Sequence, residues 1–169
     1  MKKKILCLAA AAALAASLTV PAWAAVASPY GGAEAEGGDV TYTTQAQTGE
    51  DSQATQVYET IQGAESTEQE LNLLGDGLAE TVQAELGATS VNEYSAREIG
   101  SVAVSSEGPT TVTLSNLAGV TEGTEGFVMY LGTDGLWYYL PVTFGSRSAT
   151  FTVPYSTTII LYVRTAAAV

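Results

Sequence analysis

The feature that most restricts the fold of this chain is a series of short alternating stretches between residues 97 and 164. Residues 111–115 and 147–153 alternate apolar and polar side chains, the other stretches are short and rich in apolar residues, and turn-forming residues separate one stretch from the next. The six stretches are residues 97–104, 111–115, 126–132, 136–144, 147–153 and 157–164. A period of two is typical of strands, and no helical pattern lies between them. We therefore expect residues 91–169 to form a mainly β, antiparallel sandwich of six or seven strands.

One amphipathic helix is expected before the sandwich, within residues 65–90. Ser66 is a helix N-cap residue with Gln69 at the third helical position, and Gly87 is suited to end the helix. Gly75 and Gly77 each cost about 1 kcal/mol relative to alanine in a helix interior, so a break near residues 74–75 is consistent with the pattern. The apolar stripe at spacings of three and four consists of Leu71, Leu74, Leu78, Val82 and Leu86.

Residues 25–64 have a different composition, rich in Gly, Ala, Thr, Gln and Glu. This segment carries six acidic residues and no basic one. With little apolar surface to bury, it cannot offset the entropy cost of ordering, so we expect a mostly disordered acidic spacer. Residues 40–43 and 57–58 are the two places where short strands are the alternative.

The first 24 residues have the pattern of a secretory signal peptide. Lys2, Lys3 and Lys4 precede an apolar run that ends before Pro21, and residues 22–24 read Ala-Trp-Ala. We expect cleavage after Ala24 and secretion of residues 25–169 into the extracellular space. A retained membrane anchor, the alternative, needs about 20 apolar residues and no cleavage site.

Cleavage would remove every lysine and the only cysteine. Residues 25–169 then hold three arginines against eighteen acidic residues, a formal net charge of −15. Such a charge argues against nucleic-acid and anionic-membrane partners. The whole chain has no histidine, which excludes Ser-His-Asp and Cys-His nucleophilic machinery within it. We expect no enzyme activity, no cofactor, no metal site and no stable membrane anchor after cleavage.

Carboxylates are the remaining candidates for chemistry. A glycosidase needs two carboxyl groups about 5–10 Å apart across a cleft, one with its pKa raised by burial. None of the candidate acidic residues lies in an apolar run, so we expect their carboxylates to be solvated. A small two-carboxylate glycosidase and weak calcium binding stay alternatives. These acids are Asp76, Glu80, Glu122, Glu125 and Asp134.

The aromatic run Trp137-Tyr138-Tyr139 follows the hairpin turn signal Thr133-Asp134-Gly135. A two-residue turn would pair Tyr130 with Tyr139 and gather Tyr130, Trp137 and Tyr139 on one face. That face could stack on a sugar, dock the helix or bind a partner. A three-residue turn would instead place Tyr130 with Tyr138 and bury Trp137. Both registers stay open, and Tyr130, Trp137 and Tyr139 are the candidate ligand-binding residues.

Several of these stretches together resemble a family of small exported proteins of Gram-positive gut-type bacteria. That family joins an acidic helical N-terminal part to an immunoglobulin-like C-terminal β-sandwich, and the resemblance implies an interaction module without a known activity. The residues that carry it are Val112–Leu114, Gly126–Leu131, Asp134–Trp137, Leu140–Pro141 and Ala149–Val153.

Three functions are compatible with these observations. The first is a secreted, non-enzymatic interaction or structural module whose partner is an extracellular protein or glycan surface. The second is a carbohydrate-binding module that uses exposed aromatic residues. The third is the two-carboxylate glycosidase.

Overall fold

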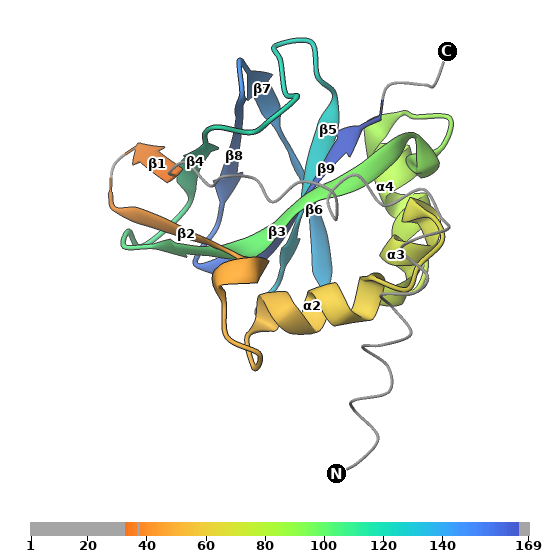
Figure 1. The fold of residues 1–169 in the computed structure, drawn as a ribbon, viewed down its shortest axis with the longest axis horizontal. Helices are drawn as coiled ribbons and strands as arrows, with labels where there is room; N and C mark the ends of the chain where they lie inside the picture. Colours follow the sequence, from red (N-terminus) through yellow and green to blue (C-terminus); the bar gives the residue numbers. More distant parts are fainter. Residues whose placement is uncertain (1–32, 37, 166–169) are drawn as a thin grey trace.

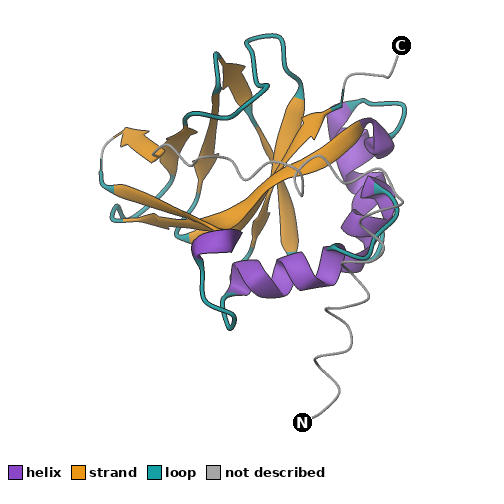
Figure 2. Cartoon of the chain, in the orientation of Figure 1, coloured by secondary structure: helices purple, strands orange, loops and turns teal. Residues whose placement is uncertain are grey.

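The computed structural model describes residues 33–36 and 38–165, and two antiparallel β-sheets dominate it (Figures 1 and 2). The expected mainly β fold is therefore confirmed. The expected signal peptide, residues 1–24, lies outside the described residues. Within those residues the strands are β1 (Ala33–Glu36), β2 (Val40–Thr44), β3 (Tyr94–Val104), β4 (Thr110–Leu114), β5 (Gly126–Leu131), β6 (Trp137–Pro141), β7 (Thr143–Gly145), β8 (Ser148–Val153) and β9 (Thr157–Arg164). The helices are η1 (Gln45–Gln47), α2 (Gln53–Ile61), α3 (Thr67–Leu74), α4 (Leu78–Leu86) and η2 (Val91–Glu93).

The molecule has three layers. One sheet has the strand order β1-β4-β8-β7 and the other has the order β2-β3-β9-β5-β6. The two sheets enclose one apolar core, and helices α2, α3 and α4 pack on the outer face of the five-stranded sheet to enclose a second (Figure 1). The five-stranded sheet is therefore the middle layer.

Strand β9 lies in the centre of this middle layer. Ile159 and Leu161 point into the core between the sheets, whereas Ile160 and Tyr162 point into the core beneath the helices. All four side chains are fully buried. A strand covered on both faces needs a continuous apolar run, and residues 159–163 supply it.

The expected single helix at residues 65–90 is two helices. The Ser66 side chain caps α3 by accepting a hydrogen bond from the Gln69 N–H at 3.2 Å. Gly75 ends α3, and Gly77 adopts the left-handed conformation (φ 72°) from which α4 begins. The glycines thus break the helix where their cost predicted a break. The apolar stripe nonetheless stays on one side, because all five of its residues pack in the core beneath the helices.

The expectation of a disordered spacer is wrong for the described part of residues 25–64. Strand β1 pairs with β4, and strand β2 pairs with β3 from Val40 to Thr44. The strand alternative at residues 40–43 is confirmed as part of β2. These strands add to existing sheet edges, so most of their ordering cost is offset by hydrogen bonds to residues far away in the sequence.

Helix α2 overturns the other strand alternative, at residues 57–58. Ser52 caps the helix by accepting a hydrogen bond from the Thr55 N–H at 3.1 Å. Ala54, Val57 and Ile61 follow at spacings of three and four, and all are buried against the five-stranded sheet. Three apolar residues suffice to dock a short helix when each becomes buried.

The described residues form nine strands, of which seven, β3 to β9, lie within residues 91–169. Strands β1 and β2 come from the preceding segment, and the stretch 136–144 is divided between β6 and β7 after Pro141. Proline has no N–H to continue a ladder, and the chain crosses there from one sheet to the other. The β3–β9 ladder has an irregularity between Ala96 and Glu98, and not at the nearby Gly100.

Gly100 instead makes room for Tyr42 of strand β2. A Cβ atom at position 100 would lie 2.5 Å from the Tyr42 ring. We expect Gly100→Ala to lower the free energy of unfolding by about 2 kcal/mol or more, because the ring and the β2 backbone would have to move. Urea denaturation of the two proteins measures this difference. Gly63→Ala is the matched control, since a Cβ atom at position 63 meets nothing within 4 Å. Equal stabilities of the Gly100 and Gly63 variants would show that β2 does not pack there.

Candidate functional site

The β5–β6 hairpin closes through the three-residue turn Thr133-Asp134-Gly135. The Gly132 N–H donates to the Leu136 carbonyl at 2.7 Å, and the Gly135 N–H donates back to the Gly132 carbonyl at 3.0 Å. Gly135 has a positive φ of 81°. A three-residue loop that ends in a left-handed residue is a common hairpin connection. The two-residue alternative is therefore wrong, because Tyr130 pairs with Tyr138 rather than with Tyr139, and Trp137 pairs with Leu131.

This register separates the three predicted ligand-binding residues. Tyr130 lies directly opposite Tyr138, and both belong to the face that is turned toward the other sheet. Trp137 and Tyr139 are on the opposite face, half-buried against the core beneath the helices. Tyr130, Trp137 and Tyr139 thus cannot form one surface, and Trp137 is a helix-docking aromatic residue.

A different aromatic cluster forms at the same hairpin. The Tyr130 and Tyr138 rings are stacked, with centroids 5.5 Å apart and planes at 28°. Tyr155, from the β8–β9 turn, approaches Tyr130 edge-on with centroids 6.2 Å apart. We call Tyr130, Tyr138, Tyr155 and the adjacent Asp134 the tyrosine surface. Tyr138 is 40% exposed, so the cluster presents aromatic area to solvent.

Asp134 supplies the charge of the tyrosine surface. Its carboxylate accepts a hydrogen bond from the Tyr138 hydroxyl at 2.5 Å and another from the Leu136 N–H at 3.0 Å. These two bonds, the Tyr138 bond first, hold the pKa of the Asp134 carboxyl below its usual value. The same bond raises the pKa of the Tyr138 hydroxyl, so Tyr138 stays a donor to Asp134. The tyrosine surface therefore carries a negatively charged hydrogen-bond acceptor, the Asp134 carboxylate, which these two bonds hold in place.

Two further bonds hold the elements of this surface together. The Thr133 N–H donates to the Tyr155 hydroxyl at 3.0 Å, which joins the hairpin turn to the β8–β9 turn. The Thr157 hydroxyl donates to the Leu131 carbonyl at 2.6 Å. The rings are consequently positioned before any ligand arrives, and they offer apolar faces beside one carboxylate.

Sequence reasoning missed Tyr138 and Tyr155 as site residues. The sequence left the length of the hairpin turn open, and choosing the three-residue turn would have placed Tyr138 beside Tyr130. Tyr155 belongs to a turn 25 positions after Tyr130 in the printed sequence, and only the pairing of β5 with β9 brings it close. The residue pattern within a single strand does not show that these two turns lie close together.

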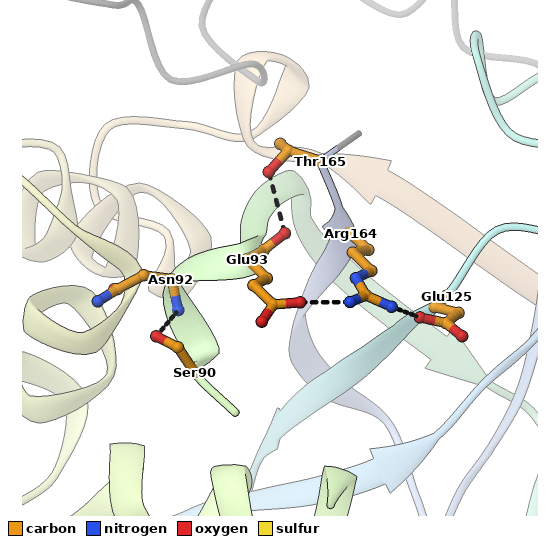
Figure 3. Close-up of polar contacts among 6 residues, drawn as sticks. All are labelled: Ser90, Asn92, Glu93, Glu125, Arg164 and Thr165. Atoms are coloured by element: carbon orange, nitrogen blue, oxygen red, sulfur yellow. Dashed lines mark hydrogen bonds and ion pairs between the residues drawn. The ribbon is translucent and has the colours of Figure 1, made fainter. Parts of the chain in front are cut away.

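A second cluster lies at the opposite end of β5, where Arg164 stands between two glutamates (Figure 3). One guanidinium nitrogen bonds Glu93 and the other bonds Glu125. The Thr165 hydroxyl also donates to the Glu93 carbonyl at 2.9 Å. Glu93, Glu125 and Arg164 line a cleft of about 470 Å³ together with Tyr94 and Thr124, among others.

Glu93, Glu125 and Arg164 form an ion-pair cluster that links three elements of the fold, and the two glutamates do not have the environments of an acid–base pair. Both glutamates are engaged by one guanidinium, and the Glu93 and Glu125 side chains are 35% and 59% exposed. A glycosidase acid requires burial that favours its protonated form. The cluster ties the end of β9 to η2 and to the start of β5. The other acids considered, Asp76, Glu80 and Glu122, are exposed.

Burial strongly affects the carboxyl group of Glu70. It lies on the sheet side of α3 with only 6% of the residue exposed, near the fully buried Tyr162. Desolvation raises the pKa of Glu70 to about 7, and the neighbouring Tyr162 hydroxyl offsets part of the rise. The cleft beside Arg164 does not have Glu70 among its lining residues, and the residue is buried in α3.

Comparison with known proteins identifies no relative: no protein-family model, curated protein or solved structure matches the chain. Across residues 33–36 and 38–165, no helix combines the length and apolarity needed to cross a bilayer. In the same residues, no three metal-ligating side chains come together.

The buried Glu70 carboxyl makes the stability of the folded protein depend on pH in a predictable direction. Its folded pKa of about 7 exceeds the usual 4.5, so the folded state holds the proton more tightly, and stability falls as pH rises from about 4.5 to about 7. The shift corresponds to a loss on the order of 3 kcal/mol. We expect Glu70→Gln to be more stable than the wild type at pH 8 and about equal at pH 5, measured by urea denaturation at both values.

Glu80→Gln is the control, because Glu80 is exposed on the neighbouring helix α4. Its stability relative to wild type should change little between pH 5 and pH 8. If the stability of Glu70→Gln relative to the wild type also changed little between pH 5 and pH 8, the raised pKa of a buried Glu70 carboxyl would be contradicted.

Proposed function

We propose that this chain is an exported, non-enzymatic interaction module that binds an extracellular protein or glycan surface. The observation that carries the proposal is the tyrosine surface, a preorganised group of three tyrosines and one carboxylate at an exposed hairpin. Tyrosine is enriched at recognition surfaces because its ring offers a large contact area at low entropic cost. Binding, rather than bond-breaking, is what these groups supply.

Export is supported by the N-terminal pattern of residues 1–24, with its lysines, apolar run and Ala-Trp-Ala end. A protein of residues 25–169 with a net charge of −15 repels nucleic acid and anionic membranes. Absence of cysteine from those residues means that the fold needs no oxidant to form.

An immunoglobulin-like assignment for the sandwich is supported by the strand order. Such folds join a sheet of order A-B-E-D to a sheet containing G-F-C, often extended by C′. Strands β1-β4-β8-β7 correspond to A-B-E-D, and β9-β5-β6 correspond to F-C-C′. Strand β3, which comes early in the chain, occupies the position of G beside F, antiparallel to β9. We extend the proposal to kinship with the small exported bacterial proteins that the hairpin residues resemble.

The non-enzymatic part of the proposal is supported by the state of the carboxylates. Asp134 is held as a hydrogen-bond acceptor, Glu93 and Glu125 share Arg164, and Glu70 lies under α3. The chain also contains no histidine to act as a base near neutral pH.

The test is a binding screen against immobilised extracellular proteins and glycans. We expect Tyr138→Ala to weaken the binding seen with the wild type by about tenfold or more, because it removes the most exposed ring of the surface. Leu73→Ala is the control: Leu73 is 49% exposed on α3, far from the hairpin, and its loss should leave binding unchanged.

Two results would contradict the proposal. One is a wild-type protein that binds no member of the screen. The other is turnover of esters, glycosides or peptides well above background, with binding insensitive to Tyr138→Ala.

A further inference from the structure

We propose that the tyrosine surface binds a neutral saccharide. The inference rests on the proposed function, because it names the ligand class of the same surface. A sugar ring has an apolar C–H face and a rim of hydroxyl groups, and each of these has a counterpart at the hairpin.

The apolar counterpart is the ring area of Tyr138 and Tyr130. Their rings are stacked, with planes 28° apart and centroids 5.5 Å apart, so Tyr130 supports one side of the Tyr138 ring and leaves the rest of that ring to solvent. Tyr138 is 40% exposed, and Leu136 next to it is 60% exposed. A pyranose face laid against such rings removes apolar area from water on both partners.

The polar counterpart is the Asp134 carboxylate. A carboxylate offers about four acceptor positions, and the Leu136 N–H and the Tyr138 hydroxyl occupy two of them. The free positions suit hydroxyl donors, which a saccharide presents along its rim. The two existing bonds hold the carboxylate in place, so a ligand does not have to order it.

The charge around the hairpin selects for a ligand without negative charge. Asp134 is an anion, and the three arginines of the described residues lie toward the other end of β5. Arg97 donates to the Ala118 carbonyl in the β4–β5 connection, the Arg147 N–H donates to Val120 there, and Arg164 is bound by Glu93 and Glu125. Phosphate, sulfate or uronate groups would meet Asp134 without a compensating cation.

The small apolar content of the surface favours a saccharide over a protein. Stable protein interfaces bury about 800 Å² on each partner around an apolar centre. Of the described residues, Leu73, Leu136 and Tyr138 are the large apolar side chains that are well exposed, and Leu73 lies away on α3. At the hairpin, the well-exposed large apolar side chains of the described residues are therefore Leu136 and Tyr138, too few for the apolar centre of such an interface.

Isothermal titration of the purified protein with oligosaccharides tests the inference. The probes are six-unit oligosaccharides of glucose, xylose, mannose and N-acetylglucosamine, with a six-unit oligogalacturonate as the anionic comparison. We expect at least one neutral probe to bind and the anionic probe not to bind. Tyr138→Ala should raise the Kd by about tenfold or more, because it removes the stacking face.

Tyr138→Phe separates stacking from hydrogen bonding. It keeps the ring and removes only the hydroxyl that holds Asp134, so we expect a Kd increase of about threefold, well below that of Tyr138→Ala. Leu73→Ala should bind like the wild type. Near-UV circular dichroism and thermal unfolding verify that each variant is folded. Tyr138→Leu, which also removes the aromatic face, replaces Tyr138→Ala if that variant fails this check, and it should weaken binding by a similar factor.

The outcomes separate this inference from the proposed function. Wild-type protein that binds none of the neutral probes, but binds an immobilised protein in a Tyr138-dependent manner, overturns the saccharide inference alone. Failure of both kinds of binding overturns both. Saccharide binding that a folded Tyr138→Ala variant retains, or tighter binding of the anionic probe, overturns the placement of the site on this surface.

Discussion

The burial of strand β9 on both faces is the constraint on which the rest of the structure depends. Ile159 and Leu161 fill the core between the sheets, and Ile160 and Tyr162 fill the core beneath the helices. Shifting β9 by one residue would exchange these pairs between two cores of different shape. The neighbouring strands β3 and β5 are therefore held in one register on either side of it, and the whole middle layer is specified by this strand.

The tyrosine surface is a consequence of that constraint. Pairing with β9 turns Val128 and Tyr130 of β5 toward the other sheet and turns Phe127 and Met129 toward the helices. The left-handed Gly135 then returns the chain with Tyr138 opposite Tyr130. The same pairing places the β8–β9 turn, with its tyrosine, beside the hairpin. The surface on which the proposed function rests is therefore formed by the pairing of β9 with β5, which fixes the positions of Tyr130, Tyr138 and Tyr155.

The parts of this fold that the sequence predicts are those with local signals. Alternation locates β4 and β8, an apolar run locates β9, and cap residues locate the ends of the helical pair at Ser66 and Gly87. Strand β2 was only an alternative, and strand β1 and helix α2 were not predicted, because the few apolar residues of these elements gain stability only from contacts distant in sequence. For the site, the sequence identified the aromatic run but assumed one buried face. Since both faces of the middle sheet are covered, alternation alone could not say which tyrosine faces solvent.

The register of the β5–β6 hairpin decides which tyrosines form the binding surface, and nuclear Overhauser effects between aromatic side chains measure it. This register predicts contacts between the Tyr130 and Tyr138 rings, whose centroids are 5.5 Å apart, and between Tyr130 and Tyr155 at 6.2 Å. It also predicts contacts between Phe127 and Tyr139 on the opposite face, with centroids 6.1 Å apart. Strong contacts between Tyr130 and Tyr139, with none between Tyr130 and Tyr138, would contradict it.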